Sequence, residues 1–238
     1  MINSSEKPAR AAGKWLAITA AVTVIGVSLT AHAGIYTFTS GSLNQSIPDN
    51  NPSGVAYGVD FAAAGLHVTD IKVSFTTSGG WNGDLYAYLS HGSDYAVLLN
   101  RVGATTSTAD GYSTSGLNIL LEPVTTHPGL TDIHTVQAPS APPTAYAADG
   151  RTVFYDDASR TQTLDVFVSG GGVDPYGSWT LFFADRAAVS TATLTGWTLE
   201  ITAVPEPVNL ALGCFAGLFL VGSFIWNLRM RRLSCSHD

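Results

Sequence analysis

Short runs in which apolar and polar residues alternate dominate the chain after residue 34 and leave few fold classes open. In the run DIKVSF, for example, Ile71, Val73 and Phe75 would share one face of a strand. Turn-forming residues bound these runs, and no long stretch after residue 34 has helical periodicity. A strand with one apolar face needs an opposing sheet to cover that face. The pattern therefore predicts an all-β sandwich or barrel.

Roughly nine or ten strands are expected, enough for two packed sheets. The runs expected as strands are GIYTFTS (34–40), VAYGVDF (55–61), DIKVSF (70–75), GDLYAYL (83–89), AVLLN (96–100), LNILL (117–121), LDVFV (164–168), GSWTLFFAD (177–185) and GWTLEI (196–201). Segment 122–150 holds most of the prolines of this region and little alternation, so we expect a long surface loop there. No internal repeat is visible, which favours one domain.

The first 33 residues have the form of a secretory signal peptide. Three basic residues precede an apolar run at 15–29, and the small residues Ala31 and Ala33 offer a signal peptidase site. We expect cleavage after Ala33; the alternative is an uncleaved N-terminal membrane anchor. Cys214 and Cys235 both lie after the sandwich region, so we expect no disulfide in that region, although an oxidising compartment would permit one.

Charge excludes one class of partner. Between Gly34 and Glu206 the sequence has 5 basic and 16 acidic residues, a net charge of −11. Nucleic acid binding needs clustered lysine and arginine, so we expect no nucleic acid partner. The same charge suits solubility, divalent cations or basic partners.

The C-terminal segment combines a proline pair, an apolar stretch and an arginine cluster. Pro205, Glu206 and Pro207 precede 21 mostly apolar residues at 208–228, long enough as a helix to span roughly 30 Å of hydrocarbon. The arginines that follow are Arg229, Arg231 and Arg232, which by the positive-inside rule would stay in the cytoplasm. Proline on both sides of Glu206 disfavours helix there and leaves an extended peptide.

This tail resembles a PEP-CTERM sorting signal, the tripartite end of bacterial exported proteins that an exosortase processes. The resemblance implies that residues 204–232 form the signal, with a transmembrane helix, and that residues 233–238 are a cytoplasmic tail. The alternative is a plain C-terminal transmembrane anchor.

Four motifs in the sandwich region occur in a specific order: IPDNNPSGV (47–55), WNGDLYAYLSHGSDYAVLLNRVG (81–103), VFYDDA (153–158) and YGSWTLFFADRAAVSTATLTGWTLEI (176–201). Together they resemble the P domain (Homo B domain) that follows the catalytic domain of subtilisin-like proprotein convertases. The resemblance implies a jelly-roll-like β-sandwich over residues 34–203. Only about a dozen residues separate the expected signal peptide from the first motif, so we expect no protease domain between them.

Carboxylates are the candidate metal ligands of this region. The resemblance implies that several motif aspartates lie near one end of the sandwich, where some bacterial members bind calcium. Calcium takes six to eight oxygen ligands. The candidates are Asp84, Asp156, Asp157, Asp174 and Asp185, with Asp84 and Asp157 foremost. The alternative is that these aspartates cap turns.

Aromatic and histidine side chains give two weaker hypotheses. Tyr86, Tyr88 and Tyr95 would lie on solvent-facing strand positions and could stack against sugars, although tyrosine also occurs there for its β-propensity alone. Trp81, Trp179 and Trp197 are expected in the core or at sheet edges. His127 and His134 lie close enough in sequence to meet, but their spacing is not that of a zinc site.

The sequence has no nucleophile elbow, no zinc-protease helix motif and no phosphate-binding loop. We therefore expect a non-enzymatic exported protein at the cell surface or in an extracellular polysaccharide matrix, with a structural or binding role. Its partners would be signal peptidase, exosortase, and matrix polysaccharide or another surface protein. The alternatives are an accessory domain acting in trans on a separate subtilisin-like protease, and a polysaccharide hydrolase.

Overall fold

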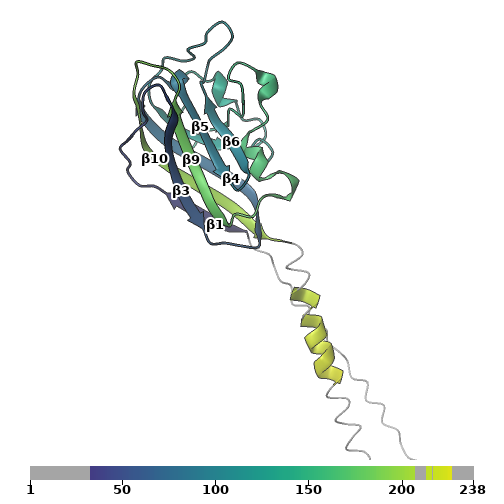
Figure 1. Ribbon diagram of the computed structural model, residues 1–238. Coiled ribbons are helices and arrows are strands. Elements are labelled where there is room, and N and C mark those ends of the chain that lie inside the picture. The colour runs from purple at the N-terminus through teal and green to yellow at the C-terminus, as the bar shows by residue number, and fades with distance from the viewer. Residues whose placement is uncertain (1–32, 207–212, 216, 227–238) are drawn as a thin grey trace, which may run out of the picture. The chain divides into compact units, whose positions relative to one another are not determined.

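The computed structural model describes residues 33–206, 213–215 and 217–226. Within these residues, ten strands form two sheets, connected by loops that contain five short 3₁₀ helices. Figure 1 shows the two sheets packed face to face. The predicted all-β class and the predicted number of strands are confirmed.

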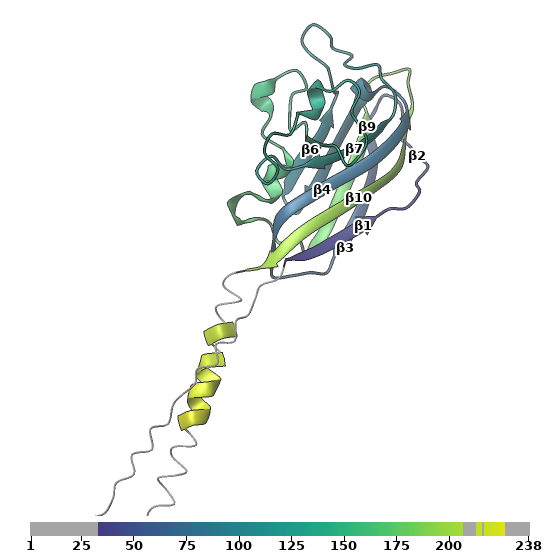
Figure 2. The same ribbon diagram turned by 180° about the vertical axis from the view of Figure 1, so that it is seen from behind.

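The larger sheet has six strands. Its members are β1 (Gly34–Thr39), β2 (Gln45–Ser46), β4 (Leu66–Gly79), β7 (Leu117–Glu122), β8 (Ala145–Ala147) and β10 (Ala192–Pro205). They run in the order β1-β10-β4-β7-β8, with β2 also paired to β10. Figure 2 shows this sheet from its solvent side. All pairs are antiparallel except β7 with β8.

The smaller sheet has four strands, and its outer surface faces the viewer in Figure 1. Its members are β3 (Asn51–Phe61), β5 (Leu85–His91), β6 (Asp94–Asn100) and β9 (Gly177–Asp185), in the order β3-β9-β5-β6. Two residues, Gly92 and Ser93, connect β5 to β6. Gly92 has φ +57°, and glycine at the first position of such a tight hairpin is favoured because it adopts this conformation without strain.

The core lies between the sheets. Phe75 on β4 meets Phe183 on β9 edge to face, with ring centroids 5.0 Å apart, which joins the two sheets at the centre. Trp179 and Trp197 are both buried, as predicted. Because apolar and polar residues alternate along the strands, each sheet has one apolar face, and that face points into the core.

One predicted strand is wrong. Run 164–168 forms the 3₁₀ helix η4 (Leu164–Phe167) rather than a strand. Leu164 and Phe167 are both fully buried, and three residues make one turn of a 3₁₀ helix, so these two side chains lie on one face. The alternating apolar residues of LDVFV hid this spacing of three.

Segment 122–150 is more ordered than a plain loop. It contains the 3₁₀ helix η2 (Ile133–Thr135) and strand β8, which extends the six-stranded sheet. The remaining 3₁₀ helices are η1 (Asn82–Asp84), η3 (Asp157–Ser159) and η5 (Ser169–Gly171). Strand β5 accordingly begins at Leu85, two residues later than the run predicted.

Strand β10 continues to Pro205, two residues beyond the expected end of the sandwich at 203. Val204 pairs with His67 and Pro205 with Leu66, and the amide of Glu206 donates to the carbonyl of Gly65. The first proline of the Pro-Glu-Pro motif therefore belongs to the sheet.

Residues 213–215 and 217–226 are helical. Among the residues that the structure describes, no helix is long and apolar enough to cross a membrane. Residues 1–32 of the predicted signal peptide, including Ala31, lie outside the described residues, and so do Pro207, Arg229, Arg231 and Arg232. The two targeting segments therefore stay predictions.

Candidate functional sites

Asp84 and Asp185 come together at one end of the four-stranded sheet. Asp84 ends η1, and Asp185 ends β9 opposite Leu85, the first residue of β5. The backbone amide of Arg186 donates to the Asp84 carbonyl at 2.8 Å, which fixes the two chain segments side by side. Both side chains are buried, with exposed fractions of 2% for Asp84 and 0% for Asp185.

This pair is buried without full compensation. Among the described residues, one carboxylate oxygen of each aspartate, Oδ2 of Asp84 and Oδ2 of Asp185, has no hydrogen-bond partner, and neither does the amide oxygen Oδ1 of nearby Asn82. Burial, and then the charge of Asp185, raises the pKa of Asp84 to about 6, against a smaller opposing effect of Arg101. Burial also raises the pKa of Asp185. Buried acceptors without partners are uncommon and need an explanation.

A hard cation would satisfy these oxygens. Carboxylate and amide oxygens are the ligand types that calcium prefers, so the donor chemistry of Asp84, Asp185 and Asn82 fits calcium. They are fewer than the six to eight oxygens that calcium takes, so backbone carbonyls and water would have to supply the rest. In the described part of the chain, no group of three or more histidine, cysteine, aspartate or glutamate side chains is arranged to hold a metal ion. Calcium binding at Asp84 and Asp185 stays a prediction.

Asp156 and Asp157 lie elsewhere, at η3. Asp156 is the N-cap of this helix and accepts from the amide of Ala158, which is the turn-capping role considered as the alternative. Asp157 accepts from Nε of Arg151 at 2.9 Å, and this hydrogen bond lowers the pKa of Asp157. Asp157 is thus already paired with a cation of the chain itself.

Arg151 is the centre of a buried charged network. It is 3% exposed and bonds Asp149 and Asp132 in addition to Asp157. Asp149, fully buried, also contacts Nδ1 of His134 at 2.7 Å. These bonds fasten the long segment after β7 onto β6, because the Asp149 carboxylate also accepts from the backbone amide at the end of that strand. The role of this network is therefore to hold two parts of the fold together.

Asp174 lies at the opposite end of β5 from Asp84. Its carboxylate accepts from the amides of Tyr176 and Gly65, and its carbonyl contacts Nε2 of His91 at 2.7 Å. The structure therefore divides the five predicted aspartates among three places. Of the aspartates that are distant in sequence, it brings together only Asp84 and Asp185.

The histidines of the long segment do not meet. His127 contacts the Asp70 carboxylate through Nε2 at 3.0 Å and Glu122 through Nδ1 at 3.4 Å. His134 instead faces Asp149 and the Ala104 carbonyl.

A second candidate site is the outer face of the four-stranded sheet. Tyr86 and Tyr88 on β5, Tyr95 on β6 and Phe182 on β9 form one cluster, which we call the aromatic platform. Tyr88 stacks on Phe182 with centroids 4.7 Å apart and 19° between the rings. Tyr88 also meets Tyr86 at 6.0 Å and Tyr95 at 6.4 Å. The three tyrosines line an open hollow with Ser90, Ser93 and Asp94 of the hairpin between β5 and β6.

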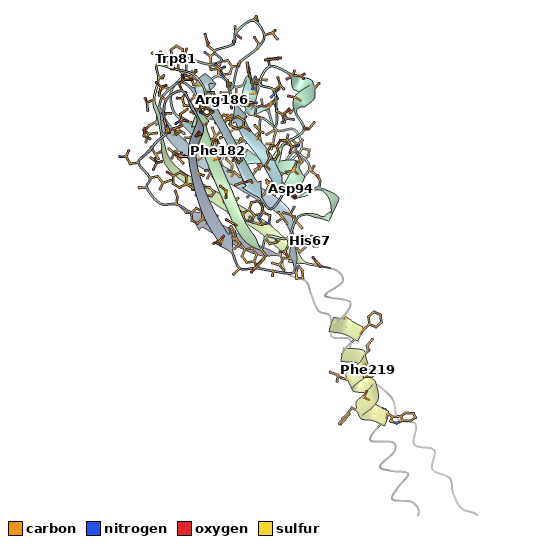
Figure 3. All side chains as sticks on the ribbon, in the orientation of Figure 1. His67, Trp81, Asp94, Phe182, Arg186 and Phe219 are labelled. Atoms are coloured by element: carbon orange, nitrogen blue, oxygen red, sulfur yellow. The ribbon has the colours of Figure 1, made fainter. Side chains whose placement is uncertain are left out.

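Charged groups border the platform at two sides. The Arg186 guanidinium lies over the Tyr86 ring, 5.6 Å from its centroid, and Asp94 lies beside the hollow at the hairpin. Figure 3 labels Arg186, Phe182 and Asp94 on the surface that faces the viewer, with Phe182 between the other two. Burial raises the pKa of Tyr86, so its hydroxyl stays a neutral hydrogen-bond donor.

Sequence reasoning found the three tyrosines but missed Phe182 and Arg186. Phe182 alternates with the buried Leu181 and Phe183, so the period of two already assigned it to the outer face. β9 pairs with β5, and this pairing places Phe182 opposite Tyr88. The sequence of one strand does not reveal which strand lies beside it. Trp81 also differs from expectation, because 45% of it is exposed, at the end of the sandwich marked in Figure 3.

Comparisons with known proteins give little beyond this geometry. No family model matches the sequence. No curated protein matches it either. Two solved structures are similar in part: the serine protease of Aeromonas sobria in complex with the chaperone ORF2 (TM-score 0.37, 13% identity) and the serine protease of Aeromonas sobria without it (TM-score 0.36, 12% identity).

Each match covers 73% of this chain, but only 28% and 27% of the two Aeromonas chains. The chain thus spans just over a quarter of the length of these proteins.

Proposed function

We propose that the protein is a non-enzymatic exported module that is retained at the cell surface or in the extracellular matrix and binds there through the aromatic platform. The observation that carries this proposal is the platform itself: three tyrosines and a phenylalanine from three adjacent strands gather on a sheet face beside an open hollow. Tyrosine is enriched in binding surfaces because it combines a large apolar ring with a polar tip.

Export would follow from the two targeting segments of the sequence. Residues 1–33 would act as the signal peptide, and residues 204–232 as a PEP-CTERM sorting signal processed by an exosortase. The end of β10 at Pro205 supports a processing site near Glu206, since the chain leaves the sheet there. Cleavage after Glu206 would release the complete sheet from the tail.

We also propose that the sandwich is a jelly roll. Two strand orders support this, β1-β10-β4-β7 in one sheet and β3-β9-β5-β6 in the other. Successive strands therefore cross from sheet to sheet, as from β3 to β4 and from β4 to β5, which is the way a double-sheet jelly roll is connected.

The test is retention of the protein outside the producing cell. A tagged full-length chain and its Tyr86→Ala/Tyr88→Ala variant are each expressed in the producing cell. The washed matrix, the culture medium and the cell interior are then assayed for the protein by immunoblot. We expect wild type in the matrix and the variant in the medium. The control is Tyr155→Ala, which removes a tyrosine that is 52% exposed but lies outside the platform.

Two results would overturn the proposal: wild-type protein confined to the cell interior, or equal matrix retention of both platform variant and wild type. Copurification with a secreted subtilisin-like protease, unaffected by the platform variant, would favour the role in trans instead.

A further inference from the structure

The aromatic platform combines ring faces with hydroxyl groups. Tyr86, Tyr88 and Tyr95 each contribute a phenol, and Ser90 and Ser93 add hydroxyls at the same hollow. Such a surface offers apolar contact and hydrogen bonds that lie a few ångströms apart. Its chemical complement is a ligand with apolar C–H faces and a rim of hydroxyls, which is the surface of a pyranose ring.

The platform is held in place before any ligand arrives. Tyr88 is paired in register with Val97 on one side and with Phe182 on the other, and its ring stacks on that of Phe182. Tyr95 stands at the start of β6, opposite Ser90, with 38% of it exposed. Side chains fixed in this way lose little conformational entropy on binding, which favours binding of a ligand that makes few strong contacts, such as a neutral sugar.

The face continues beyond the platform as a low surface. On β3, the neighbour of β9, the exposed residues Ala56 and Gly58 pair with Phe182 and Thr180. Because these side chains are small, the aromatic rings stand above the strand beside them. A ligand lying across β5, β9 and β3 would meet aromatic rings first and then backbone, which fits an extended polymer better than a single sugar.

The negative charge of the protein favours a neutral polysaccharide over an acidic one. Asp94 borders the hollow, Asp60 is exposed at the end of β3, and the region from Gly34 to Glu206 carries a net charge of −11. The cation of this face, Arg186, is already engaged over the Tyr86 ring. Desolvating an acidic polysaccharide against this field is unfavourable, whereas an uncharged chain meets no such cost.

We infer that the outer face of the four-stranded sheet binds a neutral polysaccharide, with sugar rings stacked on Tyr88 and Tyr95 and their hydroxyls bonded at Ser90 and Ser93. This inference rests on the proposed function, since it names the ligand class of the same face. The proposed ligand is an uncharged polymer of pyranose units.

The experiment uses extracellular polysaccharide of the producing cell, separated by anion exchange into a neutral and an acidic fraction. The full chain, in a detergent whose headgroup is not a sugar, is run through native gels that contain either fraction at increasing concentration. Wild type, Tyr88→Ala, Tyr95→Ala and the control Tyr155→Ala are compared, and circular dichroism verifies that each variant is folded. Tyr95→Ala keeps the test valid if loss of Tyr88 disturbs the stack with Phe182.

We expect retardation of wild type and of Tyr155→Ala by the neutral fraction, unchanged at 0.5 M salt, and affinity weakened about tenfold by either platform substitution. Binding to the acidic fraction alone, or binding abolished by salt, would overturn the inference while leaving the proposed function in place. The inference also fails, and the proposed function stands, if neither fraction retards the chain while matrix retention still depends on Tyr86 and Tyr88. If neither gel retardation nor matrix retention depends on the platform, inference and function fall together.

Discussion

Replacing Asp84 by asparagine tests the electrostatics of the buried carboxylate pair. Its pKa of about 6, compared with an ordinary 3.8, means that the folded protein holds this proton more tightly than the unfolded chain. The stability contribution of protonated Asp84 is therefore complete below pH 3.8 and is lost as the pH rises to about 6. One pKa unit corresponds to about 1.4 kcal/mol, so the full loss is about 3 kcal/mol.

Asparagine has nearly the same shape and no charge, so it avoids this loss. In the presence of a chelator at pH 7, Asp84→Asn should raise the free energy of unfolding by up to about 3 kcal/mol, or Tm by roughly 6–12 °C. At pH 3.5 variant and wild type should be equally stable. The assay is thermal unfolding followed by circular dichroism over a pH series, with Asp60→Asn, an exposed aspartate on β3, as control. A variant less stable than wild type at pH 7 in chelator would refute the reasoning.

Calcium should raise the stability of wild type relative to that of Asp84→Asn. A ligand that binds only the folded state adds RT ln(1 + [L]/Kd), about 2.7 kcal/mol at a hundredfold excess over Kd. If Asp84 and Asp185 hold calcium, the ion raises the Tm of wild type and leaves that of Asp84→Asn unchanged. Equal shifts in both proteins would exclude Asp84 as a ligand.

Four further substitutions test the scaffold by urea unfolding. Asp149→Asn should cost about 3 kcal/mol at pH 6, because it removes the carboxylate that pairs with His134 and one of the three carboxylates that pair with the buried Arg151. Burial lowers the pKa of His134, but the hydrogen bond to Asp149, the charge of Asp149 and the contact with the Ala104 carbonyl together raise it above its ordinary value of 6.5. This stabilisation is therefore complete below pH 6.5 and declines as the pH rises through the folded value, and a cost independent of pH would contradict the pairing. Gly54→Ala should cost more than 3 kcal/mol, because φ is +47° and a Cβ would lie 2.0 Å from a backbone oxygen of β9. Gly92→Ala, at φ +57° in open space, should cost about 1 kcal/mol. Equal costs for the two substitutions would contradict the close contact at Gly54. Phe167→Ala should cost about 3–5 kcal/mol as a core cavity, and a cost under 1 kcal/mol would show that η4 does not belong to the core.

Strands were predictable where burial follows a period of two. Along β9, Trp179, Leu181 and Phe183 alternate with more exposed residues, and the sequence alone reveals which face is buried. The same rule misread LDVFV, where the fully buried Leu164 and Phe167 are three residues apart. Alternation of apolar residues and an apolar spacing of three coincide in such a short run, and only the packing decides between them.

The candidate sites depend on pairing between strands, which a single sequence does not contain. Asp84 and Asp185 are about a hundred residues apart in the chain and meet because β9 pairs with β5. Asp157 has the same residue type but pairs with Arg151, a contact that the sequence alone does not reveal. Adjacency of carboxylates in sequence was therefore a poor guide to adjacency in space.

The most direct test of the account is hydroxyl-radical footprinting of the full chain, with and without the neutral fraction of the extracellular polysaccharide. Oxidation of Tyr88 and Tyr95 should fall when the polysaccharide is present, whereas Tyr155 and Tyr176, which are 52% and 60% exposed and lie outside the platform, should be oxidised equally in both samples. Unchanged oxidation of Tyr88 and Tyr95, or protection confined to the end of the sandwich near Trp81, would contradict the assignment of the outer sheet face as the binding surface.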